Sequence, residues 1–205
     1  MNDENFPENE SDDFKLPQPQ EVDIPADFHS YSEEGPFHQC QVCEKELLHS
    51  NEDYFIEKAM KRVNSTTEYV VYEYALCTSC AETLQEKMSE ESRLAIKRYM
   101  WMQANPMMLQ QRMEGNGDWK EKAGSCLIKG TPKEEVGEYT LCGYFRGNKL
   151  LVREFPYMIS FEAMDEISEL LSEETKDEMD DFKNTYLGGP PELEELFKGK
   201  PLLVL

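Results

Sequence analysis

Two short motifs, Cys40-Gln41-Val42-Cys43 and Cys77-Thr78-Ser79-Cys80, decide how this chain folds. Each is a C-x-x-C pair, and 33 residues separate the first pair from the second. Two thiolates three positions apart can bind one metal ion from a tight turn or from the first turn of a helix. Two such pairs complete a tetrahedral shell of four sulfur atoms, which is typical of Zn²⁺. The spacing therefore predicts a zinc site.

The segments that follow the first pair have the composition of a hairpin and a helix. Asp53 to Val63 and Glu68 to Leu76 are rich in Tyr, Phe, Val and Ile, and turn residues separate them, which predicts an antiparallel hairpin. From Thr78 the chain has a long stretch without Pro or Gly, which predicts a helix that opens at the second cysteine pair. Ser89 is expected to cap a second helical segment.

This order of a cysteine turn, a hairpin and a cysteine pair that opens a helix resembles the treble-clef zinc-binding modules. The resemblance covers roughly residues 37–100 and is one of architecture. It implies that the helix N-terminus supplies the last two of four metal ligands. The four ligands would be Cys40, Cys43, Cys77 and Cys80. A filled shell of four thiolates leaves no open coordination position, so the zinc is expected to be structural and not catalytic.

Other uses of these cysteines depend on the cellular compartment. No basic stretch followed by an apolar run stands near Met1, and nowhere do eighteen apolar residues stand together, so we expect a cytoplasmic location and reduced thiols. Disulfide bonds among the four cysteines are one alternative. A thioredoxin-like redox motif is another, but that fold needs βαβ units around the motif, and here a hairpin comes first. His38 and His49 are expected to be surface residues or neighbours of the ligands.

The second half of the chain repeats this order of motifs after a shift of 83 to 86 residues. The matched blocks are Cys126 to Lys129 with the first cysteine pair, Glu138 to Leu141 with Asp53 to Ile56, and Leu171 to Lys176 with Met88 to Arg93. We infer an internal duplication, and the alternative is a chance recurrence of Ser-Glu-Glu, which is common at helix starts. One sulfur remains at the ligand positions of this copy, so no zinc is expected there. The degenerate site comprises Cys126, Lys129, Ser160 and Ala163.

These elements predict an α+β protein, in which a zinc-bound treble clef is followed by a second, zinc-less unit of hairpin and helix. Residues 1–36 hold eleven acidic residues, one basic residue and several prolines, which predicts a disordered acidic tail. Residues 37–114 would form the four-cysteine zinc module with a helical extension. Residues 115–122 would be a linker, and residues 123–205 would form the degenerate second copy with C-terminal helices.

The charge of the chain is strongly negative. Its 205 residues include 42 acidic and 21 basic side chains, which gives a formal net charge of −21. Most of this excess belongs to residues 1–36, with a net charge of −10, and to residues 161–200, with a net charge of −9. Such acidity counts against general binding to nucleic acids or anionic membranes, because both need a positive surface.

The leading functional hypothesis is therefore a non-catalytic, cytoplasmic zinc module that presents a surface to a basic or amphipathic protein partner. One alternative is a thiol redox sensor that releases zinc on oxidation. Another is a nucleic-acid-binding zinc finger that uses the basic patch from Lys58 to Arg62. No nucleophile, base and orienting residue stand together in a recognisable motif, so an enzyme is not expected.

Overall fold

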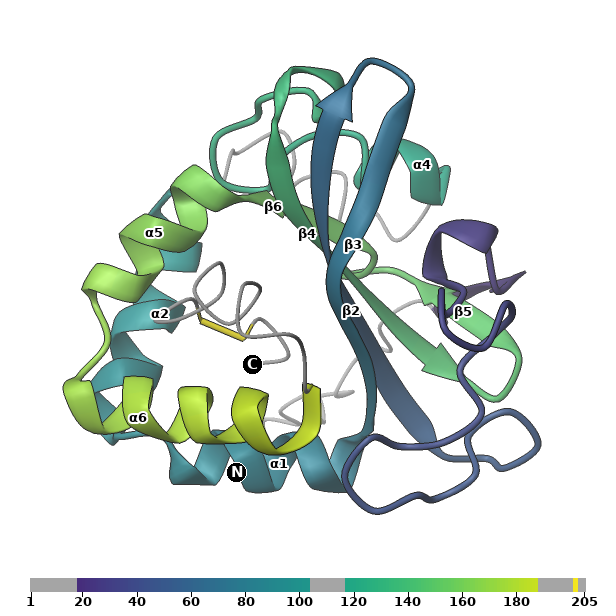
Figure 1. The fold of residues 1–205 in the computed structure, drawn as a ribbon, viewed down its shortest axis with the longest axis horizontal. Coiled ribbons are helices and arrows are strands. Elements are labelled where there is room, and N and C mark those ends of the chain that lie inside the picture. The colour runs from purple at the N-terminus through teal and green to yellow at the C-terminus, as the bar shows by residue number, and fades with distance from the viewer. Residues whose placement is uncertain (1–17, 104–116, 188–200, 203–205) are drawn as a thin grey trace, which may run out of the picture.

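An antiparallel sheet of six strands forms the centre of the protein in the computed structural model, which describes residues 18–103, 117–187 and 201–202 (Figure 1). The strands are β1 (Gln20–Asp23), β2 (Asp53–Asn64), β3 (Thr67–Cys77), β4 (Glu138–Arg146), β5 (Lys149–Val152) and β6 (Tyr157–Ser160). The α-helices of the described residues are α1 (Thr78–Lys87), α2 (Glu90–Gln103), α4 (Trp119–Lys122), α5 (Phe161–Glu169) and α6 (Glu173–Phe182). Shorter turns of helix are η1 (Ala26–Phe28), η2 (Lys133–Glu135) and the π-helical turn η3 (Lys183–Leu187).

Strands from both halves of the chain share this sheet. Its order is β1-β5-β4-β2-β3, and β6 also pairs with β4. The hairpins predicted from the sequence, β2 with β3 and β4 with β5, are confirmed. The two hairpins are joined at the centre, where β2 pairs with β4 from Asp53 opposite Arg146 to Lys61 opposite Glu138. The two predicted units therefore build one continuous sheet.

The linker expected over residues 115–122 needs a correction. Residues 104–116 lie outside the described residues, but Trp119–Lys122 form helix α4. The side chain of Asp118 caps this helix by accepting a hydrogen bond from the amide of Lys120 at 3.0 Å. Lys122 is buried, and its ammonium donates to the carbonyl of Arg153 at 3.0 Å. This part of the segment is packed structure.

The disordered tail expected over residues 1–36 also needs a correction. Residues 1–17 lie outside the described residues, whereas β1 pairs with β5, with Val22 opposite Leu150. The side chain of Phe28 is completely buried, and its ring lies 5.1 Å from that of Phe145 and 6.2 Å from that of Trp119. The acidic composition hid these contacts, because a few apolar side chains and the backbone pairing to an edge strand are sufficient to order the segment.

Different helices cover the two faces of the sheet. Helices α1, α2, α5 and α6 gather on one side, and η1 and α4 lie on the other (Figure 1). On the helical side Glu57 is completely buried at the centre of β2 and accepts hydrogen bonds from the hydroxyls of Tyr72, at 2.9 Å, and Tyr74, at 2.5 Å. Burial, together with the charge of Glu57, raises the pKa of both tyrosines well above the ordinary value. These hydroxyls therefore stay protonated as donors to the buried carboxylate.

Helices α2 and α6 begin side by side and make reciprocal contacts. The hydroxyl of Ser89 accepts from the amide of Ser92 at 3.2 Å, and that of Ser172 accepts from the amide of Thr175 at 3.3 Å. The amide of Ser89 donates to Thr175 at 3.0 Å, and the amide of Ser172 donates to Ser92 at 2.9 Å. Each helix start thus satisfies amides of the other as well as its own.

None of the helices in the described part of the chain is long and apolar enough to cross a membrane.

Replacing Phe28 by Ala should lower the free energy of unfolding by about 3–5 kcal/mol, because it removes a fully buried ring between Phe145 and Trp119. Tyr31 is 81 % exposed, so Tyr31→Ala should change stability by less than about 0.5 kcal/mol. Urea unfolding of both variants measures the difference. Equal stabilities would show that the segment from residue 18 to residue 36 does not pack on the sheet.

Candidate metal centre

The structure brings together the four cysteines that the two C-x-x-C motifs single out. Their Sγ atoms all lie within 4.8 Å of one another, and those of Cys43 and Cys77 are 3.7 Å apart. A Zn–S bond of about 2.3 Å in a tetrahedral shell places sulfur atoms about 3.8 Å apart. The sulfurs form no disulfide bond. The clustered residues are Cys40, Cys43, Cys77 and Cys80.

The first pair is held in a tight turn. The amide of Cys40 donates to the carbonyl of Lys45 at 2.9 Å, and the amide of Glu44 donates to the carbonyl of Cys40 at 2.9 Å. Glu44 closes the turn in the left-handed region, with φ of +58°. A further bond, from the amide of Gln41 to the carbonyl of Ala75 at 2.8 Å, fastens the turn to β3 two residues before Cys77. Both cysteine pairs are thereby held at the same end of β3.

The second pair stands where β3 passes into α1. Cys77 is the last residue of the strand and the N-cap of the helix, with extended backbone angles. Its side chain makes no capping hydrogen bond, and its Sγ belongs to the cluster instead. Cys80 follows in the first helical turn. The positive end of the helix favours thiolates at both positions.

The electrostatics of the cluster favour a bound cation. Burial raises the pKa of Cys40, but backbone hydrogen bonds from Cys43, Cys77 and Val42 outweigh it, so that the net pKa is lowered. Burial raises the pKa of Cys77 and of Cys80, and the charge of Cys40 raises both further. Hydrogen bonds from Cys80 lower the pKa of Cys77 without outweighing its burial. Four thiolates this close repel one another, and a divalent cation among them removes the repulsion. Four sulfur donors suit zinc and not Mg²⁺ or Ca²⁺, which prefer oxygen.

The exposure of the sulfurs is uneven. Cys40 and Cys77 are buried, Cys80 is partly buried and Cys43 is exposed. An ion can therefore enter from the side of Cys43. With four protein ligands in place no coordination position is left for a substrate, so the arrangement can hold a structural ion.

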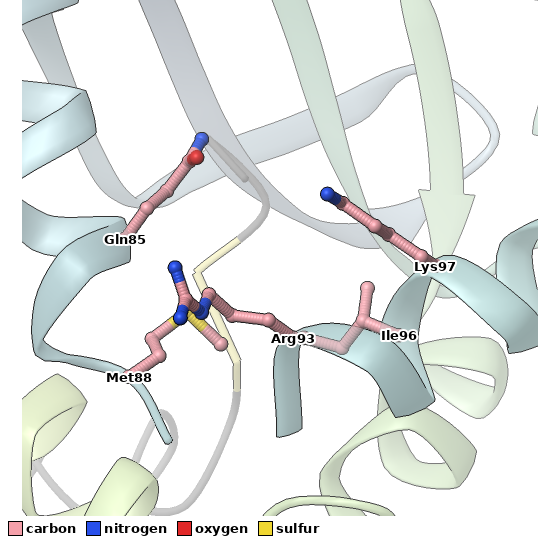
Figure 2. A pocket seen from close by; sticks show the side chains of 5 residues that line it. All are labelled: Gln85, Met88, Arg93, Ile96 and Lys97. Carbon is pink, nitrogen blue, oxygen red and sulfur yellow. The ribbon is translucent and has the colours of Figure 1, made fainter. Parts of the chain in front are cut away.

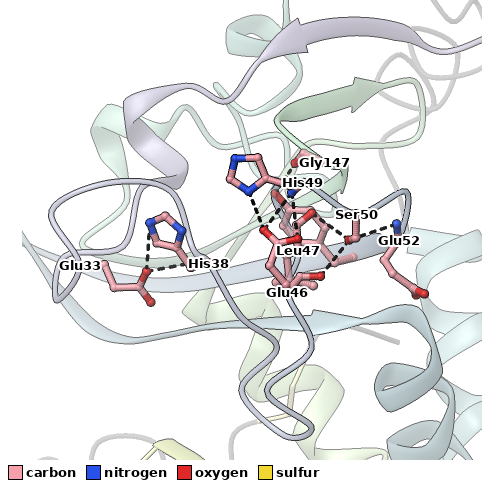
Figure 3. Close-up of polar contacts among 9 residues, drawn as sticks. Glu33, His38, Glu46, Leu47, His49, Ser50, Glu52 and Gly147 are labelled. Atoms are coloured by element: carbon pink, nitrogen blue, oxygen red, sulfur yellow. Dashed lines mark hydrogen bonds and ion pairs between the residues drawn. The ribbon is translucent and has the colours of Figure 1, made fainter.

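The two histidines near the motifs face carboxylates, as Figure 3 shows. The Nε2 atom of His38 lies 3.9 Å from a carboxylate oxygen of Glu33, and the Nδ1 atom of His49 lies 2.9 Å from one of Glu46. Their side chains are 60 % and 84 % exposed. Neither belongs to the sulfur cluster.

A second turn of the same form starts at Cys126. Its amide donates to the carbonyl of Thr131 at 2.8 Å, and the amide of Gly130 donates to the carbonyl of Cys126 at 2.8 Å. Gly130, like Glu44, has a left-handed backbone, with φ of +69°. The amide of Leu127 donates to the carbonyl of Met158 at 2.8 Å, two residues before Ser160. Every backbone bond of the first turn thus has a counterpart here.

The side chains at this second turn satisfy one another without an ion. Ser160 caps α5 by accepting from the amide of Ala163 at 3.4 Å, and its own amide donates to the Sγ of Cys126 at 3.3 Å. Lys129 turns outward and forms an ion pair with Glu166, which also accepts from the hydroxyl of Tyr99. These hydrogen bonds raise the pKa of Lys129 and lower that of Glu166. A single thiol among these side chains does not provide the set of ligands that a zinc ion needs.

The basic residues proposed to contact nucleic acid are engaged with carboxylates. Lys58 is buried and lies 3.0 Å from Glu73, its partner across the hairpin. In the same way Arg62 pairs with Glu68. Lys61 lies 2.5 Å from Glu138, which stands opposite it on β4. Cross-strand pairing of this kind neutralises the patch.

Comparisons of the chain with protein-family models, curated proteins and solved structures gave no match. What the protein does is therefore inferred from its own residues and their geometry.

Replacing Cys77 by Ser should lower the affinity for one equivalent of Zn²⁺ or Co²⁺ at least about 100-fold, because it removes one of four clustered sulfurs. Cys142 is buried as well but stands outside the cluster, so Cys142→Ser should still bind one ion per chain. Titration with Co²⁺, followed by the absorption of cobalt–thiolate bonds, measures both. Equal affinities of the two variants would contradict the assignment of Cys77 as a ligand.

Proposed function

We propose that the protein is a non-catalytic zinc protein, in which Zn²⁺ is a structural ion bound by four thiolates. The observation that carries this proposal is the cluster of four Sγ atoms within 4.8 Å of one another, from a turn and a helix N-terminus. The reduced state of such thiols fits a reducing compartment, and we propose the cytosol. The ligands are Cys40, Cys43, Cys77 and Cys80.

The zinc would act as a cross-link between three parts of the chain. It joins the turn at Cys40 to the end of β3 and to the first turn of α1, and α2 begins three residues after α1 ends. Helix α1 borders the sheet, so the ion would determine how both helices lie on it. We propose that the surface organised in this way binds a protein partner.

Removal of the ion should destabilise the protein. Zinc contributes on the order of 10 kcal/mol in small zinc peptides, and loss of even a few kcal/mol lowers the melting temperature of a chain of this size by roughly 10 °C. Elemental analysis of protein purified without chelator should find one zinc per chain. Chelation should lower the melting temperature and added Zn²⁺ should restore it. A chain without stoichiometric zinc whose melting is insensitive to chelator would contradict the proposal.

We further propose that the chain is a tandem duplication of a treble-clef unit, whose second copy has lost the ion. The matching turns at Cys40 and Cys126 support this, as do the reciprocal contacts between the starts of α2 and α6. The sheet supports it too: an offset of 85 residues relates Glu57 to Cys142, and these two residues stand opposite each other at the middle of the β2–β4 pairing. A local two-fold relation between the copies would place equivalent positions there.

The duplication predicts that a second zinc site can be restored. The variant with Lys129→Cys, Ser160→Cys and Ala163→Cys should bind two zinc ions per chain, because the backbone of the second turn already matches that of the first. Ser160→Cys alone should still bind one, since two thiols are not a closed shell. Native mass spectrometry gives both counts. A folded triple variant with one zinc would contradict the equivalence of the two sites.

A further inference from the structure

Three cations on α2 differ from all other basic residues that the structure describes. The others contact a carboxylate, a backbone carbonyl or an aromatic ring, although some of these contacts are long. Arg93, Lys97 and Arg98 have no such contact within the described residues. The chain has twice as many acidic as basic side chains. Three neighbouring cations without a partner in such a chain indicate a positively charged surface that binds another molecule.

Two of these cations point into a pocket. Arg93 and Lys97 stand one helical turn apart and extend from α2 toward Gln85 of α1, as Figure 2 shows. Met88 and Ile96, both buried, also line this cavity of about 90 Å³. Like charges one turn apart repel each other, and an anion bound between them adds an attraction to each that offsets the repulsion. The cavity has room for a carboxylate and its nearest carbon atoms.

The same exposed side of α2 carries large apolar residues. Leu94 is 56 % exposed and Trp101 is 77 % exposed, and they follow each other at a spacing of seven residues with Arg98 between them. This spacing places the three side chains on one stripe of the helix. Met102, 68 % exposed, extends the stripe. Exposed Trp, Arg and Met are the residue types enriched at protein interfaces.

Helix α6 is the equivalent of α2 in the proposed duplication. Comparison of the two indicates that the packing of α2 does not require its exposed basic and apolar residues. An offset of 83 residues relates buried Ile96 to buried Met179, so the packed sides of α2 and α6 are both apolar. On the exposed side the same offset relates Lys97 and Arg98 to two aspartates, Asp180 and Asp181. Lys97 and Arg98 are thus peculiar to α2, as are the exposed apolar residues, whereas the position of Arg93 also holds a cation on α6, Lys176.

We propose that this face of α2 binds an acidic, amphipathic segment of a partner protein. A carboxylate of the segment enters the pocket between Arg93 and Lys97, and its apolar side chains cover Leu94 and Trp101. The inference rests on the proposed interaction role, and it gives the partner a charge opposite to that expected from the acidic ends of the chain. An acidic peptide is favoured over nucleic acid, because three cations offer little against the repulsion between a polyanion and a chain of net charge −21.

The experiment uses Trp101 as reporter in the zinc-loaded full chain. The chain has two tryptophans, so Trp119→Phe leaves Trp101 as the single emitter. The probes are a synthetic peptide of Glu with Leu and Phe at helical spacing, the same peptide with Lys for Glu, and a single-stranded oligonucleotide. The acidic peptide should shift the Trp101 emission to the blue, and its affinity should fall at least tenfold between low and high salt.

A pair of variants distinguishes binding at this face of α2 from a general effect of the protein's charge. Arg93→Ala with Lys97→Ala should weaken binding of the acidic peptide at least tenfold. Lys176→Ala is the matched control, since this lysine holds the position of Arg93 on α6 and pairs with Glu173, and it should leave the affinity unchanged. Equal effects of the two variants, or tighter binding of the Lys peptide or the oligonucleotide, would overturn the proposal.

Zinc content measured on the same samples keeps this inference distinct from the proposed function. One zinc per chain without peptide binding overturns the docking face alone. Peptide binding that depends on Arg93 and Lys97 in a chain without zinc supports the docking face and overturns the zinc proposal.

Discussion

Four sulfur atoms within 4.8 Å of one another cannot all carry charge unless a cation stands among them. This constraint acts at the junction where the turn at Cys40, the end of β3 and the start of α1 meet. One backbone hydrogen bond, from Gln41 to Ala75, already holds the turn to the strand. The proposed zinc would add the helix to that junction and would so help to hold α1, and α2 after it, on the sheet. The docking face proposed on α2 lies on the helix that follows α1, so the proposed ion would help to hold that face in place.

In the second half of the chain, hydrogen bonds and an ion pair hold the equivalent turn, strand end and helix start. Its turn at Cys126 has the same backbone bonds, but Ser160 caps α5, and Lys129, at the chain position that corresponds to Cys43, pairs with Glu166. Tyr99 of α2 donates to that same glutamate, so the ion-free site contacts the first half directly. Under the proposed duplication one copy retained the ion, and the other copy replaced it with hydrogen bonds and apolar packing.

Local features of this fold could be predicted from the sequence, whereas contacts between distant segments could not. The hairpins, the helix that opens at Thr78 and the cysteine cluster each depend on composition or spacing within a short stretch. Strand β1 was missed because its partner β5 lies about 130 residues away, and β6 because it is only four residues long. The pairing of Lys58 with Glu73 depends on strand register. The role proposed for Arg93 comes from the absence of a partner in three dimensions, for which the sequence carries no signal.

The most direct measurement of the central claim is the X-ray absorption spectrum of the purified protein at the zinc edge. A structural ion held by the four clustered cysteines predicts one zinc with four sulfur neighbours at about 2.3 Å. Nitrogen or oxygen neighbours at about 2.0–2.1 Å, or a protein purified without chelator that contains no zinc, would contradict it.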